Sequence, residues 1–176
     1  MNDSLWNMLS RNFSSVGLVC AAVDGMTGSD LNDADLEQAY ETYLQLYSNI
    51  PRILCHDDLL PFNVLITNGK ATLIDWEYSG ILPYPTSLAR LIAHGEEDEA
   101  AFFHMQQDDK DYAIEYYFEH LLRDKGIDYY DYRKVMDYFL LYEYCEWIML
   151  GIKSGDTKSE RFQKYLAKAK AHIKGL

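Results

Sequence analysis

Residues 55–77 read CHDDLLPFNVLITNGKATLIDWE, and this stretch decides how the rest of the chain is interpreted. Asp58 is followed five residues later by Asn63, and Asp75 closes an apolar run further along. A hydroxyl that attacks a phosphate must lose its proton, so a carboxylate is needed within hydrogen-bond reach. Mg²⁺ prefers hard oxygen ligands and takes few of them from protein when phosphates and water supply the others. The two acids and the amide therefore predict a phosphoryl-transfer site.

The apolar runs around these residues predict that Asn63 and Asp75 lie together. Residues 64–67 and 71–74 are separated by Asn68-Gly69, which is a strong signal for a two-residue hairpin. An antiparallel hairpin with Asn63 at its entry and Asp75 at its exit brings both side chains to one end. That closeness is required of two residues that share a metal ion.

The same stretch resembles the aminoglycoside phosphotransferase and choline kinase group of small-molecule kinases. Members carry H-x-D-x-x-x-x-N followed by I-D-W/F-E-Y, which residues 55–63 and LIDWEYSG at 73–80 match. Two residues depart from the pattern. Asp57 stands where glycine or a neutral residue is common, and Ser87 stands where the family often has Asp before Leu-Ala. The first adds a charge beside the base, and the second is expected to weaken an internal support.

The resemblance implies a role for each matching residue. Asp58 would be the catalytic base, and His56 a structural residue of the catalytic loop. Asn63 and Asp75 would bind Mg²⁺ and, through it, the phosphates of ATP or GTP in the complete enzyme. The acceptor implied is a hydroxyl of a small, cationic, aminoglycoside-like or choline-like molecule.

Other interpretations of these residues remain open. A lone D-x-x-x-x-N is usually a turn with a side-chain contact, and His56 alone would more often be a buried core histidine. The joint occurrence of the loop, the hairpin and the second motif favours the kinase-type interpretation. A binding module that no longer catalyses is the second hypothesis. A metal-dependent hydrolase is the third, and the spacing suits it least.

Composition excludes several classes of protein. The chain has 176 residues, 48% of them hydrophobic, which suits one globular domain. A net charge of −12 disfavours binding to nucleic acid or to an anionic membrane. Cys20, Cys55 and Cys145 show no metal-binding spacing, so a reducing cytoplasm is expected. The longest apolar stretch, residues 16–23, is too short to cross a bilayer.

The periodicity of the apolar residues predicts an α+β fold that is mostly α-helical. We expect a single domain over residues 1–176, with the catalytic loop and metal hairpin at 52–77 and a helical substrate subdomain at 86–174. Pro83 and Pro85 should form an irregular bridge. Helices are expected at 31–48, from Thr86 or Ser87 as the cap to 94, from the acidic run 96–99 onward, at 109–125, from 130 or 131 to 152, and at 157–173.

The segment ahead of the catalytic loop is too short for a nucleotide-binding lobe as well as a helix. It contains no G-x-G-x-x-G, and no lysine occurs before Lys70. We therefore expect the C-terminal lobe of a kinase-like phosphotransferase without its N-terminal nucleotide-binding lobe. The isolated chain should then be nearly inactive. A homodimer could form through the surface that the missing lobe would cover.

Aromatic and acidic residues supply the clue to the acceptor. The chain has 15 tyrosines and 3 tryptophans, many next to carboxylates, and such groups attract cations. The alternative is that most of the tyrosines are core and rim residues. We predict that a pocket for a cationic alcohol is lined by Trp76, Glu77, Glu143, Glu146 and Trp147.

Overall fold

The computed structural model describes residues 31, 33–98 and 100–176, so the expectations for residues 1–30, including Cys20, lie outside the described residues. The described part is mostly helical with two small antiparallel sheets, which confirms the expected fold class. None of its helices is long and apolar enough to cross a membrane. The α-helices are α2 Ala34–Asn49, α3 Thr86–Ala93, α4 Gln107–Tyr117, α5 Tyr129–Ser154 and α6 Glu160–His172. The strands are β1 Arg52–Cys55, β2 Val64–Thr67, β3 Lys70–Leu73 and β4 Gly80–Pro83.

Short helical turns connect these elements. Four are 3₁₀ turns, and the fifth, η4, is a π-turn that continues α4. They are η2 Pro61–Asn63, η3 Trp76–Tyr78, η4 Phe118–Leu122, η5 Arg123–Lys125 and η6 Ile173–Gly175.

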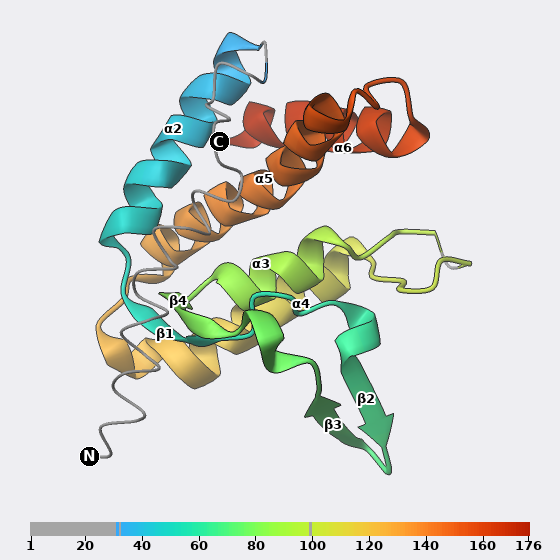
Figure 1. Ribbon diagram of the computed structural model, residues 1–176. Coiled ribbons are helices and arrows are strands. Elements are labelled where there is room, and N and C mark those ends of the chain that lie inside the picture. The colour runs from blue at the N-terminus through green and yellow to red at the C-terminus, as the bar shows by residue number, and fades with distance from the viewer. Residues whose placement is uncertain (1–30, 32, 99) are drawn as a thin grey trace.

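Helix α5 is the centre of the fold, and α2, α3 and α6 all pack against it (Figure 1). Aromatic rings fill the contact with α2: Tyr43 stacks on Tyr142 at 4.5 Å and meets the edge of Phe139 at 5.0 Å. Buried tyrosines also use their hydroxyls, because Tyr132 donates to the Ile114 carbonyl at 2.8 Å. Many of the tyrosines are thus core residues, as the alternative interpretation held.

Polar residues mark the ends of the helices. The Asp33 carboxylate accepts from the Leu36 backbone N–H at the start of α2, and Asp128 does the same for Tyr130 at the start of α5. Gly155, with φ of 73°, takes the left-handed conformation that ends α5. These residues explain why the expected boundaries of α5 lie within two residues of the observed ones.

The predicted hairpin is present. β2 and β3 pair antiparallel, with Val64 opposite Leu73 and Thr67 opposite Lys70. Asn68 and Gly69 have φ values of 50° and 73°, and two positive φ values in succession suit the right-handed twist of a tight hairpin. In Figure 1 the hairpin projects away from the helices.

The expectation of an irregular bridge at Pro83 and Pro85 is wrong in its first half. Residues Gly80–Pro83 form β4, which pairs antiparallel with β1 so that Cys55 faces Gly80 and Arg52 faces Pro83. A four-residue strand that begins with Gly and ends with Pro has no alternating pattern of its own. Its partner β1, which lies far earlier in the chain, supplies the pairing that defines it.

Residues 96–98 of the acidic run do not begin a helix, contrary to expectation, and residue 99 lies outside the described residues. Glu96 instead forms a bridge with His104, and its carboxylate lies 3.7 Å from Lys168 and also pairs with Lys164 of α6. The next helix, α4, begins only at Gln107, where Asp109 accepts from the Gln106 backbone N–H. The ion pairs between Glu96 and the α6 lysines join residues that are far apart in the sequence, so the local pattern of charges does not predict them.

The central position of α5 gives a prediction about stability. Leu141 is fully buried on this helix, whereas Leu150 on the same helix is half exposed. We expect Leu141→Ala to lower the free energy of unfolding by about 2–5 kcal/mol, because it removes buried methyl groups and leaves a cavity. Leu150→Ala is the matched control and should cost about 1 kcal/mol or less. Urea unfolding followed by circular dichroism measures both, and equal losses would contradict the central role of α5.

Candidate active site

The residues of the candidate site lie on one excursion of the chain between β1 and β4. The chain turns sharply after β1: the Leu59 backbone N–H donates to the His56 carbonyl at 3.1 Å, and Leu60 donates to Asp58 at 2.8 Å. The turn η2 then delivers Asn63, whose backbone N–H donates to Leu60. This folding places Asp58 and Asn63 on the same side of the loop.

Asp58 and Asn63 are in direct contact. The Asn63 side-chain nitrogen donates to the Asp58 carbonyl at 2.8 Å and to its carboxylate oxygen Oδ2 at 3.0 Å. Because the nitrogen end of the amide faces Asp58, the amide oxygen remains available as an acceptor or a metal ligand. Asn63 itself is buried, so this orientation is fixed by its surroundings.

The segment that carries Asp75 is held beside Asn63 by backbone contacts at Ile74. The Ile74 backbone N–H donates to the Asn63 carbonyl at 3.0 Å, and the Ile74 carbonyl accepts from His56 Nε2 at 2.8 Å. Asp75 follows with φ 61° and ψ 60°, a left-handed conformation that is unfavourable for a residue with a side chain. Its carboxylate is exposed at the exit of the hairpin.

His56 joins the catalytic loop to two other segments. Its ring is buried, binds Ile74 and packs against Trp76 at a centroid distance of 4.8 Å. Its backbone N–H donates to the Ser87 hydroxyl at 2.9 Å. Ser87 is therefore not the cap of α3, whose first residue follows Pro85 without a side-chain cap. The serine still supplies an acceptor to the loop, at the position where the resemblance led us to expect a weakened support.

A half-buried arginine on α3, Arg90, links the loop to α5. Arg90 Nη2 lies 3.4 Å from Asp58 Oδ1, and Nη1 lies 2.9 Å from Glu143 Oε2. Nη1 also pairs with the Glu146 carboxylate. Glu143 is buried, whereas Glu146 and Asp58 are partly exposed. Two of the predicted substrate residues, Glu143 and Glu146, thus face the site but already contact a cation of the protein.

Burial dominates the electrostatics of this cluster. It raises the pKa of Asp57 to about 6 and also raises the pKa of Glu143, while Arg90 opposes both shifts. Burial disfavours the charged form of Arg90 itself, but Glu143 and Glu146 outweigh this and raise the pKa of Arg90. Burial lowers the pKa of His94 to about 4, and Arg90 adds to the shift. His94 is therefore neutral at pH 7, and Arg90 is the cation of the cluster.

The other predicted substrate residues lie in two different settings. Trp76 and Glu77 are exposed on η3, at the exit of the hairpin and next to Asp75. Trp147 lies in the contact between α5 and α6, where its ring stacks on Tyr165 at 5.5 Å. The Arg161 guanidinium lies 5.0 Å from the centre of the same Trp147 ring. The faces of Trp147 are thus already in contact with α6.

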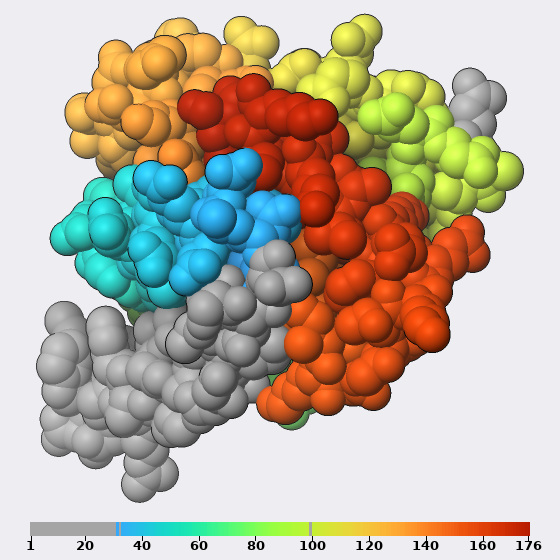
Figure 2. Space-filling view, turned by 90° about the horizontal axis from the view of Figure 1, so that it is seen from above, coloured from blue at the N-terminus to red at the C-terminus, as the bar shows by residue number. Residues whose placement is uncertain are grey.

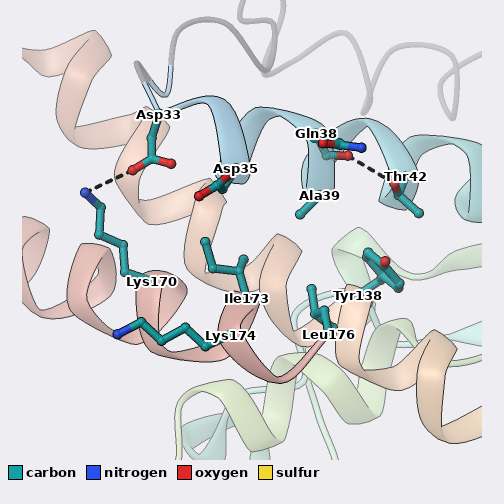
Figure 3. A pocket seen from close by; sticks show the side chains of 10 residues that line it. All are labelled: Asp33, Asp35, Gln38, Ala39, Thr42, Tyr138, Lys170, Ile173, Lys174 and Leu176. Carbon is teal, nitrogen blue, oxygen red and sulfur yellow. Dashed lines mark hydrogen bonds and ion pairs between the residues drawn. The ribbon is translucent and has the colours of Figure 1, made fainter.

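A hollow of about 560 Å³ lies elsewhere, between α2 and the C-terminal turn η6 (Figure 3). The ion pair between Asp33 and Lys170, 3.0 Å long, closes one end of it. Figure 2 shows α2 beside the C-terminal segment on the same face of the molecule. None of the predicted site residues lines this hollow.

The donor set at the hairpin fits a magnesium ion that is also held by phosphates. Asn63 offers its amide oxygen and Asp75 an exposed carboxylate, both of them hard oxygen ligands. Among residues 31, 33–98 and 100–176, no three His, Cys, Asp or Glu side chains gather to hold a metal by themselves. Two protein ligands suit Mg²⁺, which usually keeps several waters and binds substrate phosphates.

Comparison with known proteins identifies the family. A sequence profile of the phosphotransferase enzyme family matches residues 17–120. The chain belongs to this family. The predicted relation to aminoglycoside phosphotransferases and choline kinases is thereby confirmed. No curated protein sequence matches the chain at a significant level.

Two solved structures share the fold of this phosphotransferase-family chain. An ethanolamine kinase from Plasmodium vivax is 17% identical with a TM-score of 0.53, over 77% of this chain and 38% of its own. A choline kinase from Cryptosporidium parvum Iowa II is 18% identical with a TM-score of 0.50, over 99% of this chain and 52% of its own. The chain therefore spans about half, or less, of the length of these kinases.

Arg90 is the residue of this cluster that sequence reasoning missed. It is the single charged residue in Leu88-Ala89-Arg90-Leu91-Ile92, and most of the other residues of this helix are buried. A charged residue in such a setting is rarely buried without a partner. Glu143 is likewise an acid among apolar residues of α5, so the sequence offered a possible buried partner for Arg90.

The raised pKa of Asp57 gives a prediction about pH. An acid whose folded pKa lies above its unfolded value of 3.8 stabilises the protein below that value, and this contribution is lost as pH rises through about 6. Asp57→Asn should therefore be more stable than the wild type at pH 8 by about 1–3 kcal/mol, relative to the same comparison at pH 4. Urea unfolding at the two pH values measures this. A stability difference between Asp57→Asn and the wild type that is the same at both pH values would contradict the assignment.

Proposed function

We propose that this chain is the acceptor-binding and catalytic lobe of a small-molecule kinase, which transfers the γ-phosphate of ATP or GTP to a hydroxyl. The observation that carries the proposal is the hydrogen-bonded group formed by Asp58, Asn63 and Ile74. In it a carboxylate and an amide oxygen lie beside the segment that presents the Asp75 carboxylate. This is the arrangement of groups that phosphoryl transfer requires.

In this proposal Asp58 accepts the proton of the acceptor hydroxyl. Its carboxylate is partly exposed, so an acceptor can reach it, and its contacts hold it in one orientation. Asn63 and Asp75 would hold Mg²⁺, which when bound neutralises charge on the phosphates. His56 fixes the loop through Ile74 and Ser87 and touches no substrate. Catalysis rests on positioning and charge stabilisation, without covalent chemistry on the protein.

The acceptor we propose is a small cationic alcohol of the aminoglycoside or choline type. Asp57, Asp58, Glu143 and Glu146 surround one arginine, so the cluster carries an excess of negative charge. Such a cluster attracts cations and steers them to the base. The similar solved structures are named as kinases of ethanolamine and choline, both amine-bearing alcohols, which supports this class. Trp76 and Glu77 would meet the acceptor at the hairpin exit, and Trp147 would support the far wall.

We also propose that residues 1–176 form one domain, with the catalytic loop and metal hairpin at 52–77 and the helical substrate subdomain at 86–174. The strands of the described residues form two two-stranded sheets and no larger nucleotide-binding sheet, so we propose that residues 31–176 are inactive, or nearly so, without a nucleotide-binding lobe. The free, buried thiols of Cys55 and Cys145 suit a reducing cytoplasm. Neither nucleic acid nor a membrane is proposed as a partner.

The proposed base gives the decisive functional prediction. We expect ATP- and Mg²⁺-dependent phosphorylation of an amine-bearing alcohol when a kinase nucleotide-binding lobe is fused ahead of this chain. Asp58→Asn should abolish turnover, because the amide cannot accept the hydroxyl proton. Asp75→Asn should weaken the binding of Mn²⁺, used as a probe for Mg²⁺, while Asp58→Asn leaves it nearly unchanged. Turnover with ethanolamine, choline and an aminoglycoside panel is measured by ADP release, and Mn²⁺ binding by calorimetry.

The control for this experiment is Asp124→Asn, which removes an exposed acid that has no part in the site. It should retain both turnover and Mn²⁺ binding. A fused protein that keeps its turnover with Asn at 58 would show that the base is a different residue.

A second candidate function is a standalone binding or protein-docking lobe. The observation that favours it is the apolar character of the surface formed by β1 and the excursion between β1 and β4, which we call the hairpin surface. Its large exposed side chains are Ile53, Leu54, Phe62, Leu65, Ile66, Ile74, Trp76 and Tyr78. A surface of this kind is usually covered by another polypeptide. We propose a second copy of this chain as the occupant, which would make the isolated chain a homodimer.

The hairpin surface gives a prediction about oligomeric state. Leu54 is 63% exposed and Ile66 is 68% exposed. We expect the double variant Leu54→Ser, Ile66→Lys to convert a dimer to a monomer, because it places polar groups in an apolar contact. Sedimentation equilibrium measures the change. Phe102→Ser, at a residue that is 83% exposed outside the hairpin surface, is the control and should leave the dimer intact. A wild-type chain that is monomeric at all concentrations would exclude the homodimer.

A further inference from the structure

We propose that Arg90 of α3 is a positioning residue, which links the catalytic carboxylate of Asp58 to α5 and holds it in place without touching the substrate. The inference rests on the proposed function, because it assigns a role in the reaction for which Asp58 is the base. It goes beyond the motif, since neither of the two sequence patterns includes residue 90.

The two oxygens of Asp58 are held by different parts of the chain. Oδ2 accepts from the Asn63 amide at 3.0 Å, within the loop itself. Oδ1 faces Arg90 Nη2 at 3.4 Å, from α3. A carboxylate with a donor on each oxygen cannot rotate freely about its terminal torsion, so its remaining lone pairs point in fixed directions. A base that must meet an acceptor hydroxyl at a defined angle depends on such an orientation.

The position of Arg90 is in turn fixed by α5. Its Nη1 contacts Glu143 at 2.9 Å and also pairs with Glu146, one helical turn further along the same face. Glu143 is buried in the most central helix, so its contact with Nη1 anchors the guanidinium. The planar fork of arginine can serve several carboxylates at once, which a lysine ammonium on a flexible stem does less well. Arg90 thus transfers the rigidity of α5 to the loop.

None of the groups that face Arg90 can take its place as a donor to Asp58. The titratable groups that face it are Asp57 and Asp58 from the loop, His94 from the end of α3, and Glu143 and Glu146 from α5. Lys168 of α6 contacts Glu96 and the Ala93 carbonyl, so its ammonium is engaged outside this cluster. His94 is neutral, as described above. Loss of Arg90 would therefore leave Asp58 without its second donor.

The test separates this positioning role from a simple contribution to folding. Arg90→Gln alone leaves the Glu143 carboxyl buried without its cation and is expected to unfold part of the protein. The double variant Arg90→Gln, Glu143→Gln removes that carboxyl and should restore a cooperative thermal transition. Glu143→Gln alone keeps Arg90 against Asp58 and Glu146. Arg133→Gln is the matched control, because it removes an arginine that pairs with Asp111 between α4 and α5, away from the loop.

The readout is the side-chain amide resonance of Asn63 in the folded 176-residue chain, observed by nitrogen–proton correlation spectroscopy. This amide donates directly to Asp58 Oδ2, so it reports the orientation of the carboxylate without any need for turnover. We expect the resonance to shift in the double variant by clearly more than in Glu143→Gln or Arg133→Gln. A merely structural role of Arg90 would leave it at the position seen in Glu143→Gln, and that result overturns the inference.

The same variants in the fused kinase distinguish the inference from the proposed function. If Arg90 positions the base, the double variant should lose about 100-fold in kcat with KM changed by less than about threefold. A wild-type fusion that shows no turnover at all counts against the proposed function, whereas the Asn63 resonance alone decides whether Arg90 orients Asp58.

Discussion

The pairing of β1 with β4 is the constraint on which the site depends. Cys55 lies opposite Gly80, so the roughly two dozen residues between them form a loop whose two ends are held together by the strand pair. Every residue of the two motifs lies inside this closed excursion. The Ile74 contacts to His56 and Asn63 then divide it into a catalytic loop and a projecting hairpin. Closing a segment of this length costs about 3 kcal/mol in chain entropy, which the ladder hydrogen bonds and the burial of Cys55 and Leu82 offset.

Buried charge is the second organising element, and here the balance is less favourable. Removing Glu143 and Asp57 from water is expensive, as their raised pKa values show, and one arginine serves the whole group. A hydrophobic cluster of similar volume would often be at least as stable. The arrangement is explained better by function than by stability, because it keeps a carboxylate oriented at the surface of the loop and leaves an excess of negative charge for a cation. Desolvation of these acids lowers the stability of the fold, whereas the resulting contacts orient the Asp58 carboxylate.

Sequence reasoning succeeded where the signal is local. Asn68-Gly69 predicted the hairpin because only residues that tolerate positive φ form that turn, and Gly155 predicted the end of α5 for the same reason. The hairpin was also expected to bring Asn63 to the end from which Asp75 leaves, and Ile74, the residue before Asp75, contacts Asn63 there. The partners that come from far along the chain could not be foreseen. β4 is recognisable as a strand only when β1 lies beside it. Glu96 does not start a helix and instead pairs with Lys164, near the other end of the chain. Arg90 and Glu143 each gave a local warning, a charge among apolar residues, but only the fold shows that they are partners.

The contacts that shape the site are all contained in the described residues, whereas the hairpin surface is not covered by them. Asp58 is held by Asn63 and Arg90, His56 by Ile74 and Ser87, and Arg90 by α5. The orientation of the Asp58 carboxylate is therefore set within residues 31, 33–98 and 100–176. Leu54 and Ile66, by contrast, leave most of their apolar surface exposed. A preformed loop next to an exposed apolar surface agrees with the proposed role as a catalytic lobe, in which a second polypeptide segment would pack against the hairpin.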